Sequence, residues 1–276
     1  MNASIPLAAV LGTSTEVSKS PRLFQYWMRE YGLLGHYIPI NVEKARLEQT
    51  LRTLPELGFV GVNVTVPHKE LALEIADIVT DRAAIIGAAN TLIFRTDGKI
   101  HADNTDGYGF TQNLVQGAPD FDFTAGPAVV LGAGGASRAV IAALLEMGVP
   151  KIFLSNRTRH RAETLRTVFG ARIEVVEWVT VGNFLEQSNV VVNTTSLGMK
   201  GKTPLRVPLD GLRPGTLVTD IVYTPLETDL LKTARQVGCP TVDGVGMLLH
   251  QAVPGFERWF GHRPEVTEDV RQVILA

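Results

Sequence analysis

The chain has 276 residues, 45% of them hydrophobic and 20% charged, which fits a soluble globular protein of one large or two ordinary domains. Its formal net charge of −2 excludes a general attraction to nucleic acid or to acidic membrane surfaces. The first residues carry no charged leader segment, and no apolar run approaches the roughly 18 residues that a membrane span needs.

The numbers of cysteines and histidines further narrow the class of protein. Cys239 is the only cysteine, so an intrachain disulfide is impossible, and we expect a cytoplasmic protein with this thiol as a buried spectator. The six histidines show no metal-ligand spacing, and the sequence predicts no metal site.

The chain begins with a predicted strand over residues 5–11, followed by a loop over 13–20 that is rich in hydroxyl groups. Pro21 suits the first position of a helix, which makes Ser20 the predicted N-cap. Hydroxyls and free N–H groups at a helix start also suit a carboxylate. Simple capping accounts for Ser20 but not for Ser18, so capping and anion binding both remain open for this loop.

Three further elements lead to a lysine. The pattern predicts a strand over 36–41, an amphipathic helix over 43–54 and a strand over 59–66. Asn63 and Thr65, two residues apart, should project to the same side of the last strand. Lys69 follows Pro67 at a helix start, where position alone favours a solvated surface lysine over a functional ammonium.

A hairpin and a polar cluster come next. Asn90 stands beside a predicted strand over 91–95, and an Asp97-Gly98 turn leads into a second extended run. Residues 103–107 read DNTDG and precede a helix. An Asx-type turn with an N-cap accounts for one of the two aspartates and leaves the other for a further role. We expect the chain to cross between two domains at or just before this helix.

Residues 128–139, AVVLGAGGASRA, predict a strand, a glycine-rich turn and a helix start. Gly132 and Gly134 leave the backbone open for a pyrophosphate, which the N–H groups at the start of the next helix would bind. The spacing is G-x-G-x-x-S, with Ser137 where the dinucleotide fingerprint has glycine or alanine. A turn of this kind also occurs without a ligand.

The strand predicted over 151–155 ends at a basic segment. An acidic residue here would hold the ribose 2′-hydroxyl of NAD, but the chain has Asn156, Arg157 and Thr158, then Arg159 and Arg161. Guanidinium groups bind a 2′-phosphate that a carboxylate would repel. The alternative is a solvated basic loop. The segment favours NADP.

The second half alternates strands and helices. Further strands are predicted over 172–176, 190–193 and 217–222, which indicates a doubly wound parallel sheet between about residues 107 and 243. Polar residues follow two of these strands, at 193–199 and 220–225, where open α/β sheets bind their ligands. Residues 243–251 lead into a helix that reaches Trp259, and 267–276 predict a last amphipathic helix.

These motifs, in this order, resemble the shikimate dehydrogenase family over nearly the whole chain. The motifs that carry the resemblance are Ser18-Lys19-Ser20-Pro21, Asn63-Val64-Thr65-Val66-Pro67-His68-Lys69, Gly87-Ala88-Ala89-Asn90-Thr91, Asn104-Thr105-Asp106-Gly107, Gly132 to Ala139, Asn156-Arg157-Thr158, Asp220-Ile221-Val222-Tyr223 and Asp243-Gly244 to Gln251. The resemblance implies reversible, NADP-dependent reduction of 3-dehydroshikimate to shikimate in aromatic amino-acid biosynthesis.

The resemblance also implies roles for individual residues on the substrate. Ser18 and Ser20 would hold the carboxylate, and Lys69, paired with Asp106, would transfer the proton. An ammonium within hydrogen-bond reach can stabilise and protonate the alkoxide that hydride transfer leaves. The remaining implied ligands of the ring hydroxyls, besides Asp106, are Asn63, Thr65, Asn90, Tyr223 and Gln251.

The implied cofactor residues fall into four groups. The pyrophosphate would lie on Gly132, Ala133, Gly134, Gly135 and Ala136, and the 2′-phosphate on Asn156, Arg157, Thr158 and Arg161. Thr195, Ile221 and Gly244 would line the nicotinamide, and Asp81 stands where the family often has an acidic residue touching the cofactor.

The implied architecture is α/β, with a substrate-binding domain over 1–106, a Rossmann-like NADP domain over 107–243 and C-terminal helices over 244–276 that return to the substrate domain.

Four positions depart from the family pattern. Ser14 and Val17 replace a proline and a histidine in the first loop, Ala89 replaces a valine and Thr224 an asparagine. None of these removes an implied ligand, but Val17 alters the loop that carries the two serines. Two alternatives therefore stay open, a quinate/shikimate dehydrogenase paralogue and a catalytically silent NADP sensor, and the protein is expected to be a monomer or a homodimer.

Overall fold

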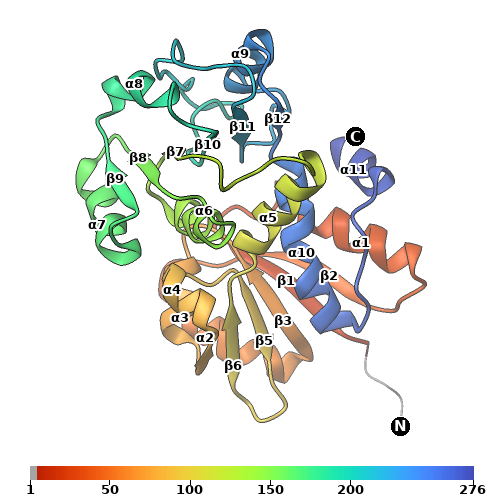
Figure 1. Ribbon diagram of the computed structural model, residues 1–276. Helices are drawn as coiled ribbons and strands as arrows, with labels where there is room; N and C mark the ends of the chain where they lie inside the picture. The colour runs from red at the N-terminus through yellow and green to blue at the C-terminus, as the bar shows by residue number, and fades with distance from the viewer. Residues whose placement is uncertain (1–4) are drawn as a thin grey trace. The chain divides into compact units, whose positions relative to one another are not determined.

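The computed structural model describes residues 5–276 and divides the chain into two compact units (Figure 1). The first unit comprises the chain up to Thr105 together with Gln251–Ala276, and the second comprises Asp106–His250. Residues 1–4, part of the stretch expected to carry no leader segment, lie outside the described residues. The chain therefore leaves the first unit once and returns to it at Gln251.

The first unit is built on a mixed six-stranded sheet with the strand order β2-β1-β3-β5-β6-β4. Its strands are β1 (Leu7–Gly12), β2 (His36–Asn41), β3 (Phe59–Val64), β4 (Ile78–Val79), β5 (Thr91–Phe94) and β6 (Ile100–Asp103). The strands β1, β2 and β3 run parallel, whereas β5 pairs antiparallel with both β3 and β6. The β5–β6 pair is the hairpin that the Asp97-Gly98 turn predicts.

Helices cover both faces of this sheet. They are α1 (Ser20–Glu30), α2 (Leu47–Thr53), α3 (Lys69–Ile75), α4 (Asp81–Ile86), the part of α10 (Val245–Phe260) from Gln251 onward, and α11 (Glu268–Leu275). Leu47, Leu51 and Ala72 pack with Leu11 and Val62 on one face. The opposite face carries the aromatic residues of α1 and α10.

Two local predictions in this unit were wrong. The helix expected over 43–54 is divided into a 3-10 turn at Lys44–Arg46, the helix α2 and a second 3-10 turn at Leu54–Leu57. Pro55 lacks the N–H that would continue the α-helical pattern. Lys19, not Ser20, is the N-cap of α1, so Ser20 is the first helical residue.

An aromatic layer fills the face under α1 and α10. Phe24 stacks on Tyr37 with ring centroids 3.8 Å apart, and Trp259 lies 5.9 Å from Phe24. Gly61 of β3 makes this packing possible, because a Cβ there would lie 2.0 Å from Nε1 of Trp259. A residue larger than glycine would push the indole out of the layer.

The second unit contains a six-stranded, fully parallel sheet with the order β12-β11-β10-β7-β8-β9. Its strands are β7 (Ala128–Leu131), β8 (Ile152–Ser155), β9 (Ile173–Val175), β10 (Val190–Asn193), β11 (Leu217–Asp220) and β12 (Thr241–Val242). Its principal helices are α5 (Asp106–Gly117), α6 (Gly135–Glu146), α7 (Arg159–Phe169), α8 (Gly182–Leu185) and α9 (Asp229–Val237). The doubly wound sheet is confirmed, and it has the strand order of dinucleotide-binding sheets.

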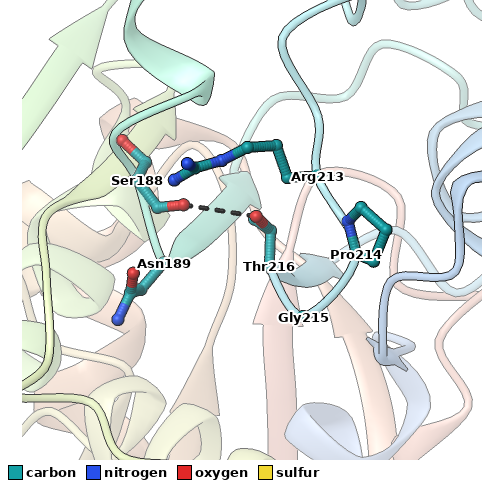
Figure 2. A pocket seen from close by; sticks show the side chains of 6 residues that line it. All are labelled: Ser188, Asn189, Arg213, Pro214, Gly215 and Thr216. Carbon is teal, nitrogen blue, oxygen red and sulfur yellow. Dashed lines mark hydrogen bonds between the residues drawn. The ribbon is translucent and has the colours of Figure 1, made fainter.

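The amino ends of β10 and β11 border a polar pocket of about 510 Å³ (Figure 2). Thr216 Oγ1 donates a hydrogen bond of 3.3 Å to the carbonyl of Ser188, and the Arg213 side chain extends toward Ser188. Ligands of parallel α/β sheets bind at the opposite, carboxyl ends of the strands. This pocket therefore lies at the wrong end of the sheet for a nucleotide.

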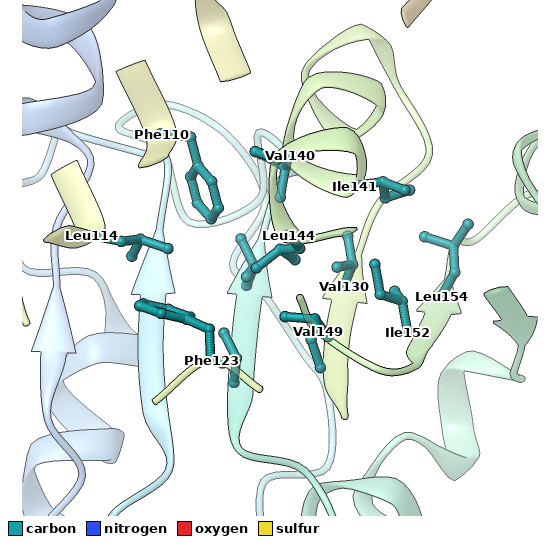
Figure 3. Packing of buried hydrophobic residues seen from close by; sticks show 14 of the residues in the cluster. Phe110, Leu114, Phe123, Val130, Val140, Ile141, Leu144, Val149, Ile152 and Leu154 are labelled. Carbon is teal, nitrogen blue, oxygen red and sulfur yellow. The ribbon is translucent and has the colours of Figure 1, made fainter. Parts of the chain in front are cut away.

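The core of the second unit has two layers because alternate strand residues face opposite sides. Val130, Leu154 and their neighbours pack against Phe110 of α5 and Leu144 of α6 (Figure 3). Val129 and the other alternate positions pack against α8 and α9. Cys239 belongs to this second layer with 6% exposure, as expected, and burial raises the pKa of its thiol. Within residues 5–276, no helix is both long and apolar enough to cross a membrane.

Candidate active site

The loop that carries Ser18 and Ser20, residues 18–20 (the serine loop), leads directly into α1. Ser18 Oγ accepts a hydrogen bond of 3.2 Å from the backbone N–H of Ser20. Ser18 is half-buried and Ser20 is buried. Two hydroxyls and the start of a helix therefore converge at one point, which is an arrangement suited to a carboxylate.

A network of hydrogen bonds centred on Asn90 joins four segments of the first unit. The Asn90 carboxamide oxygen accepts from the backbone N–H of Thr105 at 2.8 Å, and its nitrogen donates to Thr105 Oγ1 at 3.0 Å and to Gln251 Oε1 at 3.3 Å. Asn63 Nδ2 donates to the Asn90 carbonyl at 3.2 Å. The structure thus brings together Asn63, Asn90 and Gln251, which are far apart in sequence, and adds Thr105.

Tyr37 connects this network to the serine loop. Its buried hydroxyl donates to Asn63 Oδ1 at 2.7 Å. Burial raises the pKa of the Tyr37 phenol well above its usual value, and a hydrogen bond with Ser20 opposes that shift. Sequence reasoning missed Tyr37, because only the pairing of β2 with β1, and of β1 with β3, places it beside Asn63.

Asp103 fixes the chain where it enters the DNTDG cluster. Its carboxylate is 1% exposed and accepts bonds from Arg82, which contacts both oxygens, from Thr80 Oγ1 at 2.8 Å and from the Asn104 N–H at 2.8 Å. Burial alone would raise the pKa of this carboxyl, but Arg82 and the two further donors lower it below its usual value. Asp103 is therefore a structural anchor.

Lys69 and Thr65 lie at the end of β3. Lys69 is the first residue of α3, and its carbonyl accepts a hydrogen bond of 2.8 Å from the N–H of Ala89, the residue before Asn90. Thr65 continues the β1 ladder, since its N–H donates to the Leu11 carbonyl at 2.9 Å. Both residues are half-buried. The backbone of Lys69 is thus hydrogen-bonded to the residue that precedes Asn90.

In the second unit, the glycine loop after β7 approaches the loop after β10. Gly132 has φ +109°, and a Cβ there would lie 2.7 Å from Thr194 Oγ1 and 2.8 Å from Thr195 Cγ2. Ser137 is fully buried, 2.5 Å from the Thr194 hydroxyl, and its Oγ accepts from the Gly134 N–H. Ser137 therefore packs against the glycine loop. This is the role of the third glycine or alanine of the dinucleotide fingerprint, which allows close packing of helix and strand.

The arginines of the basic segment after β8 differ in whether they have acidic partners. Arg159 forms ion pairs with Glu163 and Glu177. Arg157 and Arg161 are exposed and, among the described residues, take part in no ion pair. Asn156 accepts a hydrogen bond of 3.1 Å from the Ala133 N–H, so the segment adjoins the glycine loop. Two guanidinium groups beside the loop are available for an anion.

The loops after β11 and β12 meet at Ile221 and Gly244. A Cβ on Gly244 would lie 2.4 Å from the Ile221 carbonyl oxygen, so no larger residue fits there. Asp220, buried below Ile221, accepts hydrogen bonds from Asn193, Val222 and Thr228, and burial raises the pKa of its carboxyl. Burial also raises the pKa of the Tyr223 phenol.

These features fit a dinucleotide. The loops from β7 and β10 lie at the point where the strand order reverses, which is the ligand-binding point of open α/β sheets. A Cβ at Gly134 or Gly135 would meet no atom within 4 Å, so the backbone at the start of α6 is open to a phosphate. The second unit therefore has the backbone geometry and the cations that NADP requires.

The remaining predicted residues divide between the units. Asp81 is exposed at the start of α4 in the first unit, and Asp106 is the first residue of α5 in the second. The pairing of Lys69 with Asp106 and the contact of Asp81 with the cofactor stay predictions.

A dinucleotide-binding sheet in one unit and a cluster of hydroxyl and amide groups in the other are features of a nucleotide-dependent oxidoreductase. Family models agree over three parts of the chain: the shikimate dehydrogenase substrate binding domain matches residues 10–92, shikimate / quinate 5-dehydrogenase matches 116–199, and the shikimate 5′-dehydrogenase C-terminal domain matches 244–275. The chain belongs to the shikimate dehydrogenase family.

Relatives and solved structures extend these matches. A shikimate dehydrogenase (NADP(+)) of Cereibacter sphaeroides is 65% identical, covering 99% of this chain and 98% of its own, and that of Paracoccus denitrificans is 60% identical, covering 98% and 96%. Shikimate 5-dehydrogenase of Thermus thermophilus, solved with NADP(H) and shikimate, superposes with a TM-score of 0.87 at 33% identity and 98% coverage of both chains. Quinate dehydrogenase of Corynebacterium glutamicum, solved with NAD, gives 0.90 at 31% identity and 99% coverage of both.

The Asp103 anchor generates a stability prediction. Asp103→Asn should lower the free energy of unfolding by about 2 kcal/mol at pH 7, because the charged hydrogen bonds to Arg82 are lost in a buried position. The folded-state pKa of Asp103 is lowered, so its stabilisation is present above the unfolded pKa of about 3.9 and is lost as pH falls through the lowered value. The difference between variant and wild type should therefore shrink in acid.

Urea unfolding at pH 7 and at pH 3 measures this difference. Asp97→Asn is the matched control, because Asp97 also pairs with an arginine but lies in an exposed turn, and it should change stability little. Equal effects of the two substitutions at pH 7 would contradict the anchor role.

Proposed function

We propose that this protein catalyses the NADP-dependent, reversible reduction of 3-dehydroshikimate to shikimate in aromatic amino-acid biosynthesis, in the cytoplasm. The observation that carries the proposal is the Asn90 network. It gathers amide and hydroxyl groups from β3, from the residue before β5, from the loop after β6 and from α10, and these are the kinds of groups that bind a ring with several hydroxyls. The names of the relatives in Cereibacter and Paracoccus support the same activity and the same cofactor.

The side chains proposed to bind the substrate are those that the family resemblance implies. Ser18 and Ser20 would receive the carboxylate at the start of α1. Asn63, Thr65, Asn90, Asp106, Tyr223 and Gln251 would bind the ring hydroxyls. Tyr37 and Thr105 would orient these groups, because each already holds one of their carboxamides by a hydrogen bond.

The proton is assigned to Lys69. The nicotinamide supplies the hydride when NADPH is bound, and the reduced carbonyl then needs a proton on its oxygen. The Lys69 ammonium would donate that proton to the alkoxide, and in the reverse direction the neutral amine would remove it. Asp106 is the proposed partner that orients the ammonium.

The 2′-phosphate is assigned to Arg157 and Arg161, with Asn156 and Thr158. Arg159 is excluded from this task because Glu163 and Glu177 already neutralise it. The pyrophosphate would lie on residues 132–136, and Thr195, Ile221 and Gly244 would border the nicotinamide.

Initial rates with shikimate and with quinate, each with NADP and with NAD, test the activity. We expect fast turnover only for shikimate with NADP, since the basic segment after β8 contains no carboxylate for the 2′-hydroxyl of NAD. Comparable rates with quinate or NAD would instead indicate a quinate/shikimate dehydrogenase paralogue. Tight NADP binding without turnover of either substrate would indicate a sensor.

Lys69→Met should lower kcat by about 100-fold or more and leave KM for shikimate within about threefold, because a methionine fills the same space but carries no proton. Lys44→Met, an exposed lysine on the same unit, is the control and should leave both constants unchanged. A Lys69→Met enzyme with wild-type kcat would remove this lysine from the mechanism.

Arg157→Ala should raise KM for NADP about tenfold or more and leave KM for NAD almost unchanged, since only NADP carries the 2′-phosphate. Arg159→Ala is the matched control from the same segment and should affect both cofactors little. The assignment fails if Arg157→Ala weakens NAD as much as NADP.

A further inference from the structure

Lys19 lies between the two serines in the sequence, and its side chain reaches the C-terminal segment (residues 261–276). Its Nζ donates a hydrogen bond of 2.5 Å to the backbone carbonyl of Ile274, in the last turn of α11. Carbonyls in the last turn of a helix lack partners within the helix, and a cation is favoured at that end of the helix dipole. The Lys19 ammonium therefore caps α11.

The C-terminal segment also holds the other end of α1. Trp27 Nε1 donates to the Glu265 carbonyl at 3.2 Å, and the Glu265 N–H donates to the Tyr31 hydroxyl at 3.0 Å. The Tyr31 ring lies 4.0 Å from that of His262. Along the segment, Val270 and Ile274 are fully buried, and α11 packs against α1 (Figure 1).

The two attachments fix α1 at both of its ends. Its first turn is joined to Ile274 through Lys19, and its last turn is joined to Glu265 through Trp27 and Tyr31. The Ser18 hydroxyl accepts a hydrogen bond from the backbone N–H of Ser20, on the other side of Lys19, so a shift of the Lys19 backbone moves both serines. The side chain that sets their position is tied to a helix 255 residues further along the chain.

We propose that Lys19 is a positioning residue for the substrate carboxylate, and that α11 takes part in substrate binding through it. The inference rests on the proposed function, since it takes the serine loop as the carboxylate site. Lys19 itself does not touch the substrate. Its bond to Ile274 holds the two hydroxyls at the spacing that a carboxylate requires, so that binding does not have to order the loop first.

A different role for Lys19 would be long-range attraction of the anionic substrate by its charge. Lys19→Gln separates the two roles, because glutamine carries no charge but its amide can still donate to the Ile274 carbonyl. Lys19→Met removes both the charge and the donor. A positioning role predicts that glutamine retains much of the affinity that methionine loses, whereas a charge effect makes the two variants alike.

The experiment measures kcat and KM for shikimate and for its methyl ester with Lys19→Met, Lys19→Gln and the control Lys44→Met. We expect Lys19→Met to raise KM for shikimate about tenfold, with kcat within about twofold and KM for NADP unchanged. Lys19→Gln should raise KM by about threefold or less, and Lys44→Met should not change it. KM for the methyl ester should respond little to any variant, because it has no carboxylate for the serine loop to bind.

Ser18→Ala and Ser20→Ala separate failure of this inference from failure of the proposed function. If neither alanine variant raises KM for shikimate, the serine loop is not the carboxylate site, and the role assigned to the two serines falls together with this inference. If the alanine variants raise KM but Lys19→Met does not, or if Lys19→Gln is as weak as Lys19→Met, the positioning role is overturned while the proposed function stands. A thermal melt of each variant confirms that the protein assayed is folded.

Discussion

The Asn90 carboxamide is 2% exposed, and its oxygen and nitrogen both bond to groups from other segments of the first unit. A buried amide in this position is costly to leave unpaired, by about 1–3 kcal/mol for each lost partner, so the ends of β6 and β3 and the middle of α10 are held in one relative arrangement. Asp103 reinforces that arrangement from the other side of Thr105, through Arg82 and Thr80. The candidate substrate site thus depends on a fully bonded polar core and not on apolar packing alone.

The candidate cofactor site of the second unit depends on a different structural feature, the carboxyl edge of its parallel sheet. Its parallel sheet brings the loops after β7, β8, β10, β11 and β12 to one edge, so that main-chain N–H groups and a few cations gather there. Close backbone approaches at Gly132 and Gly244 shape that edge. The distribution of acidic partners then decides which arginines are available: glutamates neutralise Arg159 and leave Arg157 and Arg161.

Local patterns predicted most of the fold. The strands at 36–41, 128–131 and 190–193 have the predicted bounds, because each is a short apolar or β-branched run between turn residues. The strands β4 and β12, of two residues each, escaped prediction because they are too short for any periodicity. The roles of Tyr37 and Lys19 were also beyond local reasoning, since strand pairing defines the first and a helix at the far end of the chain defines the second. The DNTDG cluster was partly understood: sequence reasoning missed the structural role of Asp103, because its arginine partner lies 21 residues earlier.

The division of the first unit between two stretches of sequence has a consequence for synthesis on the ribosome. The second unit is continuous from Asp106 to His250, so its sheet can close as soon as that stretch has emerged. The first unit must wait, because Phe256 and Trp259 supply the rings that pack against Trp27 and Phe24, and Gln251 completes the Asn90 network. Of the two units, the one whose residues are made first is therefore the last to be finished, and its exposed aromatic face is where a nascent chain would need protection.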